Sequence, residues 1–139
     1  MADYKRPLPI PNQDTKEFWD GCKNHELRIQ KCQNCVRYRF EPSFICPWCM
    51  SLNTEWVKVS GKGSVYSFSV YRQPSEPAFA DMVPYVVALI ELEGIGVRMI
   101  SNIIDCQPEE VKIGMKVEVV FDDVTEKVTL PKFRTVREV

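Results

Sequence analysis

The sequence is poor in several features that would place it in a common functional class. It has one histidine among 139 residues, and no apolar run approaches the ~18 residues that a membrane span needs. Residues 1–7 lack the apolar core of a secretory signal. Basic residues are not in excess, because 18 Lys and Arg stand against 19 Asp and Glu. We therefore expect a cytoplasmic globular protein with no membrane segment, whose thiols stay reduced.

What the chain does have is cysteine in a metal-binding pattern. Cys32 and Cys35 form one Cys-x-x-Cys pair, Cys46 and Cys49 form a second, and ten residues separate the pairs. Two such knuckles direct four thiolates at one cation, at ~2.3 Å, in a closed site that holds structure and does not react. We predict a structural Zn²⁺ site at these residues. Iron with an electron-transfer role is the alternative, because four thiolates accept either metal.

The order of patterns along the chain predicts two modules. Residues 1–25 are expected to form a Pro-rich arm and a helix, and residues 26–60 a four-cysteine zinc ribbon. A ribbon this small buries too little apolar surface to fold without its metal. Residues 61–139 form the larger module, which has enough apolar residues for a core of its own.

The larger module has the alternation of a β-barrel. Tyr66, Phe68 and Val70 share one face of a first strand, so we expect them to point into a core. Further strands are expected over 85–93, 97–104, 115–121 and 127–130, with a helical turn at Pro108 and the last strand ending before Pro131. Three strands, a short helix and two more strands favour a five-stranded OB-fold barrel, with a small sandwich as the alternative.

At this point the chain resembles a bacterial and archaeal family, formerly of unknown function, that joins a rubredoxin-like zinc ribbon to an acyl-CoA-associated OB-fold. The resemblance covers nearly the whole chain and rests on the order and spacing of several motifs. These motifs are Glu17-Phe18-Trp19, Gln30-Lys31-Cys32-Gln33-Asn34-Cys35, Cys46-Pro47-Trp48-Cys49, Gly61-Lys62-Gly63-Ser64-Val65-Tyr66-Ser67-Phe68, Pro84-Tyr85-Val86-Val87-Ala88-Leu89, Ile113-Gly114-Met115-Lys116-Val117 and Leu130-Pro131-Lys132-Phe133.

The resemblance implies a non-catalytic subunit of a thiolase-like enzyme. Similar proteins associate with thiolases, with retro-aldolases that shorten steroid or aromatic acyl-CoA side chains, and with an archaeal thiolase assembly. In them the OB-fold sits beside the CoA channel and the ribbon helps to dock the enzyme subunit. The implied partners of this chain are a thiolase-like protein, in a hetero-oligomer of paired dimers, and an acyl-CoA.

A CoA-ester needs a few cations for its phosphates and an apolar slot for its pantetheine. Arg72 begins an irregular loop that contains Phe79 and Met82, and Arg98 follows the turn Gly94-Ile95-Gly96. We predict contacts of these four residues with a CoA-ester or with the partner. The alternative for the arginines is an ordinary exposed strand end, whereas apolar residues in an irregular loop often mark an interface.

The predicted N-terminal helix, over about residues 14–24, carries an aromatic pair. Asp14 is expected to cap it with Glu17 three residues on. Phe18 and Trp19 lie on one side of this helix. They either dock on a partner or pack against the protein's own ribbon.

The chain has few candidate residues for thiolase chemistry of its own, and a pair of Cys22 or Cys106 with His25 is the alternative to a non-catalytic chain. That chemistry needs a nucleophilic cysteine, an acid–base group and an oxyanion hole. His25 is the only histidine, and neither Cys22 nor Cys106 stands in a recognisable nucleophile motif. We expect the two cysteines to be small buried apolar residues and His25 to be a surface residue or a neighbour of the metal.

Nucleic-acid binding is the second hypothesis, because zinc ribbons and OB-folds both serve it. A nucleic-acid barrel needs a basic groove, since phosphate neutralisation supplies most of the non-specific affinity. Residues 61–139 hold nine Lys and Arg against twelve Asp and Glu, which makes the barrel the acidic module. Charge therefore favours the enzyme-subunit hypothesis.

Overall fold

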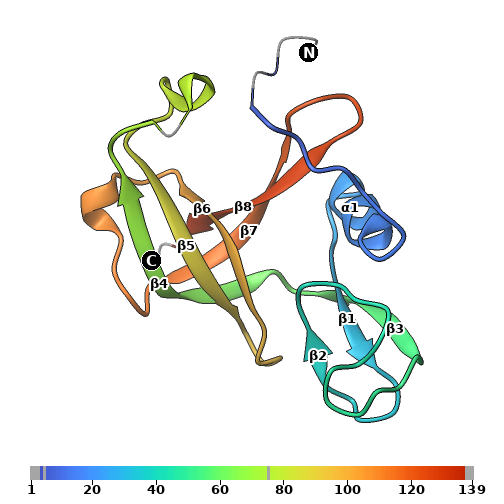
Figure 1. Cartoon of the computed structure of the whole chain (residues 1–139). Coiled ribbons are helices and arrows are strands. Elements are labelled where there is room, and N and C mark those ends of the chain that lie inside the picture. The colour runs from blue at the N-terminus through green and yellow to red at the C-terminus, as the bar shows by residue number, and fades with distance from the viewer. Residues whose placement is uncertain (1–3, 5, 75, 137–139) are drawn as a thin grey trace.

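A computed structural model describes residue 4 and residues 6–74 and 76–136. These residues form two modules, and a short helix that precedes both in the chain packs against each of them (Figure 1). The helix α1 spans Lys16–Lys23, shorter than predicted. The Asp14 cap is wrong, because the side chain of Asn12 accepts the backbone N–H groups of Asp14 and Thr15 at 2.9 Å each. An Asx turn therefore precedes the helix and replaces the capping box.

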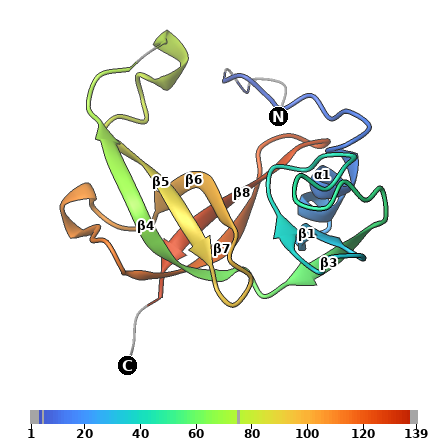
Figure 2. The same ribbon diagram turned by 60° about the horizontal axis from the view of Figure 1, so that its bottom comes forward.

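The first module is a three-stranded antiparallel sheet that carries the cysteine knuckles. Strand β1 (Leu27–Cys32) lies between β2 (Tyr38–Arg39) and β3 (Thr54–Val59). Cys32 ends β1 opposite Thr54, so the first knuckle begins where the sheet stops. The second knuckle lies in the irregular segment between β2 and β3, as Figure 2 shows from a second direction.

The second module is the closed five-stranded barrel that the sequence predicts. Its strands follow the order β4-β5-β6-β8-β7, and the β6–β8 pair is parallel whereas the others are antiparallel. The bounds are β4 Lys62–Tyr71, β5 Tyr85–Leu92, β6 Arg98–Ile104, β7 Lys116–Asp123 and β8 Thr129–Thr135. Two 3₁₀ turns, η1 (Pro77–Phe79) and η2 (Pro108–Glu110), interrupt the connections.

Tyr66 does not point into the barrel, contrary to the alternation argument. Val65 pairs with Ile90 and Ser67 pairs with Leu89, so one residue between them is extra and β4 carries a bulge. The bulge reverses the faces: Val65 is buried before it, Phe68 and Val70 turn inward after it, and Tyr66 is 46% exposed. A strict period of two cannot reveal such an insertion.

The last strand is also longer than predicted, because β8 continues through Pro131. The carbonyl oxygen of Pro131 accepts a hydrogen bond from the Ser101 hydroxyl of β6 at 2.7 Å. The nitrogen and the carbonyl of a strand residue point to the same side, so the proline nitrogen, which lacks a hydrogen, also faces β6. The β6–β8 ladder begins only at Ile103 and Phe133, beyond the proline. The missing donor therefore costs no ladder hydrogen bond, which is the condition under which strands tolerate proline.

One apolar cluster connects the two modules. It contains Leu27 and Ile29 of the ribbon, Ile90 and Phe133 of the barrel, and Phe18 of α1, which is 3% exposed. The helix thus packs across the side of the barrel beside β8 and holds the ribbon against it (Figure 1). Among the described residues, no helix has the length and apolarity to cross a bilayer.

Candidate metal centre

Both cysteine knuckles have the same local geometry. In the first, the Val36 N–H donates to the Cys32 carbonyl oxygen at 3.0 Å, and in the second the Met50 N–H donates to the Cys46 oxygen at 2.9 Å. Val36 and Met50, each following the second cysteine of its pair, both have a left-handed backbone, with φ of 58° and 64°. Each pair therefore folds into one tight turn that directs its two sulfurs to the same side.

The two knuckles bring the four predicted sulfurs together. All four Sγ atoms lie within 4.8 Å of one another, with Cys32–Cys49 at 3.6 Å and Cys35–Cys46 at 3.5 Å. A tetrahedral zinc ion with Zn–S bonds of ~2.3 Å requires sulfurs about 3.8 Å apart. The short sulfur–sulfur distances and the all-thiolate donor set fit Zn²⁺. The four cysteines fill the four positions of a tetrahedral site, so no other side chain is needed as a ligand.

Amide groups of the knuckles stabilise the thiolate form of Cys32 and Cys49. An N–H···S contact of 3.4 Å joins the Cys35 amide to the Cys32 sulfur, and this contact lowers the pKa of Cys32. Hydrogen bonds from the Asn34 side chain and the Ser51 amide lower the pKa of Cys49 to about 6. Donors aimed at sulfur favour the charged form that binds metal.

A buried cation in the same sheet was missed by the sequence argument. Arg39 is 4% exposed, and its Nη2 donates to the Ser43 carbonyl oxygen at 2.9 Å and to the Thr54 hydroxyl at 2.7 Å. Thr54 is the strand partner of Cys32, so the guanidinium belongs to the sheet that carries the first knuckle. Two net negative charges remain when four thiolates hold a divalent ion, and a buried arginine in this module opposes them. The alternation of β2 gave no signal for it, because the strand is only two residues long.

The structure does not gather the predicted CoA-ester contacts at one place. Arg72 follows β4 and lies 3.7 Å from Glu109, while Phe79 and Met82 belong to the half-buried part of the adjoining loop. Arg98 lies at the other end of the barrel, where it pairs with Glu91 at 3.1 Å and covers the ring of Tyr66 at 3.7 Å. Tyr71, next to Arg72, pairs with Tyr85, and Arg98 pairs with Glu91. The stretch of β5 from Tyr85 to Glu91 spans about 20 Å.

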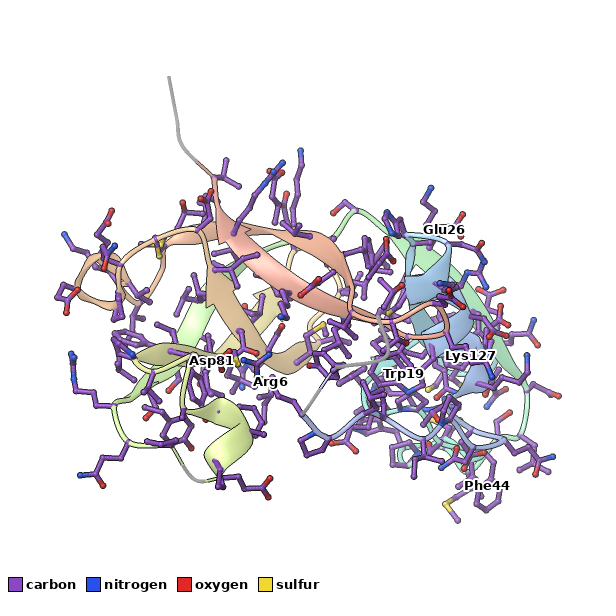
Figure 3. All side chains as sticks on the ribbon, turned by 90° about the horizontal axis from the view of Figure 1, so that it is seen from above. Arg6, Trp19, Glu26, Phe44, Asp81 and Lys127 are labelled. Carbon is purple, nitrogen blue, oxygen red and sulfur yellow. The ribbon has the colours of Figure 1, made fainter. Side chains whose placement is uncertain are left out.

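The N-terminal arm reaches the predicted loop. The Arg6 guanidinium forms an ion pair with Asp81 at 2.5 Å, and it lies 5.8 Å from the Phe79 ring (Figure 3). Phe79 in turn lies 6.0 Å from the ring of Tyr85. The arm and the loop are therefore in contact on the barrel side of the molecule.

The aromatic pair of α1 divides between two roles. Phe18 contacts Phe40 of the ribbon at a ring distance of 5.4 Å and is buried, so it packs within the protein. Trp19 is half-buried and borders a groove described below. Of the two alternatives for Phe18, partner docking and packing within the protein, the structure favours packing, because α1 covers the side of the barrel.

The remaining candidate nucleophile and base are separately engaged. Cys22 is fully buried, and burial raises the pKa of its thiol to about 12, while Cys106 is half-buried. His25 is exposed, with Nε2 3.1 Å from the Asp123 carboxylate and its ring stacked on Phe121 at 5.3 Å. His25 thus links the end of α1 to β7 of the barrel.

The fold and the cysteine centre together define a protein that joins a zinc ribbon to an OB-fold barrel. Two family models match the chain in that order: the rubredoxin-like zinc ribbon domain of ChsH2 over residues 19–55, and the C-terminal OB-fold domain of ChsH2 over residues 56–122. A DUF35 domain-containing scaffold protein of Methanothermobacter thermautotrophicus is 42% identical over 106 residues, which cover 76% of this chain and 78% of that protein. The chain belongs to this ChsH2/DUF35 family, and the resemblance seen in the sequence is confirmed.

Two further relatives extend the comparison. A probable enoyl-CoA hydratase alpha subunit of Thermomonospora curvata is 38% identical over 129 residues, 93% of this chain, but the chain spans only 40% of that protein's length. A solved structure titled Ltp2-ChsH2(DUF35) aldolase is 37% identical with a TM-score of 0.83, covering 91% of this chain and 98% of the matched chain. A DUF35 structure from Sulfolobus solfataricus, at 16% identity and a TM-score of 0.64, shares the fold.

Proposed function

We propose that this chain is a non-catalytic subunit of a thiolase-like enzyme that acts on acyl-CoA substrates, by thiolysis or by retro-aldol cleavage. The observation that carries the proposal is the similarity, over nearly the whole chain, to the ChsH2(DUF35) component of a solved aldolase. A chain that contributes no reacting group needs a partner that supplies them. The zinc ion has a structural role in this proposal, holding the ribbon in a fixed shape.

The state of the titratable groups supports a non-catalytic role. A thiol with a pKa of about 12 is not a thiolate at neutral pH, which disfavours Cys22 as a nucleophile. The His25 ring is held by the Asp123 carboxylate of the barrel, while the hydrogen bond of His25 with Cys22 joins backbone atoms. The four knuckle sulfurs face one another and are committed to metal.

The ribbon offers a surface on which a partner can dock. Five large apolar side chains of the knuckles and their flanking segments are at least half exposed, and we call them the ribbon tip. They are Val36, Phe44, Trp48, Met50 and Leu52. Several exposed large apolar side chains on one small module are characteristic of a protein interface. A metal-stiffened surface also loses little conformational entropy on binding.

The loop that begins at Arg72 is the proposed acyl-CoA contact. Its half-buried Phe79 is positioned by contacts with the Tyr85 ring and the Arg6 guanidinium. The N–H of Met82, also half-buried, donates to the Phe79 carbonyl oxygen at 3.0 Å. Arg98 lies at the other end of the barrel, so it and Arg72 do not bind the same phosphate group. In a reconstituted complex, Arg72→Ala is expected to raise the KM for the acyl-CoA while leaving the complex intact.

The experiment that tests the proposal is purification of the tagged chain with its native partner. We expect a thiolase-superfamily enzyme to co-purify, the chain alone to cleave no acyl-CoA, and the reconstituted pair to be active. Phe44→Ser, at the ribbon tip, should weaken the complex, whereas Ile113→Ser, an equally exposed apolar residue of the barrel, should not. Turnover by the isolated chain, or co-purification of RNA with ribosomal proteins, would contradict the proposal.

A further inference from the structure

The barrel has an unpaired edge on β6. Strand β6 pairs with β5 from Arg98 to Ile103, but it pairs with β8 only at Ile103 and Ile104. The stretch Arg98–Asn102 therefore has a neighbouring strand on one side only. Open edges of this length are ready to accept another strand, and proteins usually cover or charge them.

The backbone of this edge points outward at two residues. The Leu92 N–H donates to the Val97 carbonyl oxygen at 2.8 Å, so Val97 and every second residue after it direct their backbone groups toward β5. Arg98 and Ile100 consequently direct their N–H and C=O groups away from β5. Within residues 6–74 and 76–136, no hydrogen bond reaches those groups.

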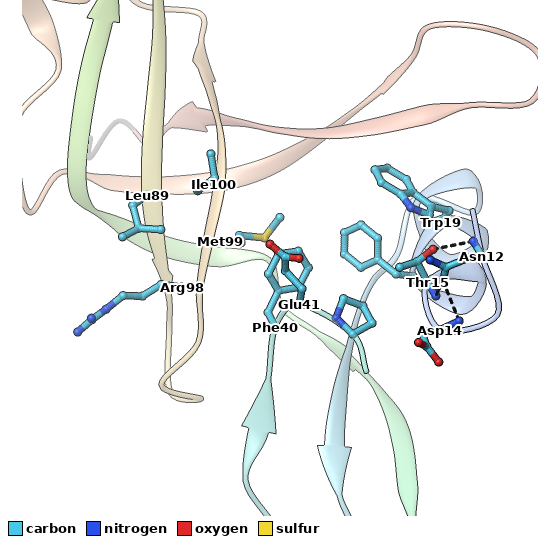
Figure 4. Close-up of a pocket in the computed structure, with 12 residues that line it drawn as sticks. Asn12, Asp14, Thr15, Trp19, Phe40, Glu41, Leu89, Arg98, Met99 and Ile100 are labelled. Atoms are coloured by element: carbon cyan, nitrogen blue, oxygen red, sulfur yellow. Dashed lines mark hydrogen bonds between the residues drawn. The ribbon is translucent and has the colours of Figure 1, made fainter. Parts of the chain in front are cut away.

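The outward groups open into an apolar groove. Two adjoining cavities, of about 490 and 300 Å³, run along β6 between the barrel and α1. They share a lining of Phe18, Trp19, Phe40, Met99 and Ile100. Figure 4 shows β6 on one side of this groove and the aromatic residues of α1 and Phe40 on the other. Ile100 is 69% exposed although it lies in the middle of a strand.

The charges of the groove select among possible occupants. Asp14 and Glu41 line the larger cavity, and in the described part of the chain neither carboxylate has an ion-pair partner. The only cation of that cavity, Arg98, is already paired with Glu91. The ribbon side of the groove therefore carries uncompensated negative charge, which favours a cationic group in an occupant.

We propose that the open edge of β6 binds an extended segment of a partner polypeptide as an added strand. That segment has apolar residues at alternate positions, which face Trp19 and Ile100, and a lysine or arginine beside Asp14 and Glu41. Five residues of β6 offer about 17 Å of edge, enough for a short strand. An acyl chain would fill the groove but leave the backbone groups of Arg98 and Ile100 unpaired, whereas a strand pairs them.

This inference deepens the proposed function by naming how a partner chain attaches to the barrel, and it rests on that function only in requiring a polypeptide partner. The strand site is separate from the ribbon tip, so a partner can use both. Its test needs no knowledge of the partner, because any peptide with the right backbone and pattern should bind. The two proposals can therefore fail independently.

The probe is a capped hexapeptide with an N-terminal lysine followed by alternating valine and threonine. Its binding is followed by the NMR shift of the Trp19 indole N–H at high protein concentration and by protection of the Ile100 amide from hydrogen exchange. Two N-methylated peptides serve as controls. One carries methyl groups on every second amide, and the other carries them on the remaining amides. We expect one version to bind like the parent and the other to lose about fivefold to tenfold in affinity per blocked hydrogen bond.

Matched protein variants test the same edge from the other side. Ile100→Pro removes an N–H that no described group accepts, so zinc content and circular dichroism should stay unchanged while peptide binding is lost. Ile100→Val keeps the N–H and should bind normally. Asp14→Asn with Glu41→Gln should weaken the lysine peptide but not its norleucine analogue.

Several results would overturn the proposal. Equal binding of the two N-methylated peptides would mean that side chains alone hold the probe, and no binding of the parent peptide would remove the site. A concentration-dependent dimer dissolved by Ile100→Pro would assign the edge to a second copy of this chain. A shift of the Trp19 indole N–H signal by decanoyl-pantetheine, without competition from the peptide, would assign the groove to an acyl chain.

Discussion

Truncation of Phe18 to alanine should separate the role of α1 as a structural bridge from a role as a partner anchor. The ring is 3% exposed and contacts Trp19 and Phe40 at ring distances of 5.0 and 5.4 Å. Removal of a buried phenylalanine ring costs about 3–5 kcal/mol, and loss of the aromatic pairs places this site toward the upper part of that range. A chain of this size should then melt about 15 °C lower.

Phe44→Ala provides the matched control, because it deletes the same ring where it is 68% exposed. An exposed substitution of this kind changes stability by no more than about 0.5 kcal/mol. Urea unfolding with excess zinc, followed by far-UV circular dichroism, measures both variants. The bridge argument fails if Phe18→Ala loses less than about 1 kcal/mol or matches the control, because the ring would then be exposed in solution.

Two other predictions concern the metal and pH. The chain should bind one zinc ion through four thiolates, so a thiol reagent should release one equivalent of metal. The Cys35→Ser variant should lose the ion, whereas Cys22→Ser should keep it. Zinc retention by Cys35→Ser would refute the assignment. Hydrogen bonds from Thr129 and then His25 lower the pKa of Asp123 below its usual 3.8. The charged carboxylate therefore stabilises the fold above that value and stops doing so as the pH falls through the lower, folded-state pKa. The urea midpoints of the wild type and Asp123→Asn should differ at pH 6 and converge once the pH is below the folded-state pKa, and a difference that is constant with pH would contradict the assignment.

Much of the architecture followed from local patterns. The spacing of Cys32, Cys35, Cys46 and Cys49 predicted two knuckles, because each turn is closed by neighbours in sequence and needs no distant contact. Apolar alternation predicted the barrel strands for the same reason, since the face of a residue in a strand depends only on its position along it. The acidic balance of residues 61–139 also came from composition alone.

The errors came where a distant part of the chain decides the local structure. The bulge beside Tyr66 arises in the pairing of β4 with β5, and the alternation of β4 carries no trace of it. Pro131 is tolerated in β8 because the β6 ladder starts beyond it, which cannot be read from the residues around the proline. Arg39 became notable only when the sheet buried its guanidinium.

The sequence by itself determined the metal ligands to consider, the two modules and the family, because these depend on spacing and periodicity within short segments. The tertiary structure alone decided that Phe18 is buried between the modules, that Arg72 and Arg98 lie at opposite ends of the barrel, and that β6 keeps an open edge beside an apolar groove. Those features depend on which strands meet and where their pairing stops. Such long-range pairings are selected by the packing of the whole chain, so no local pattern encodes them.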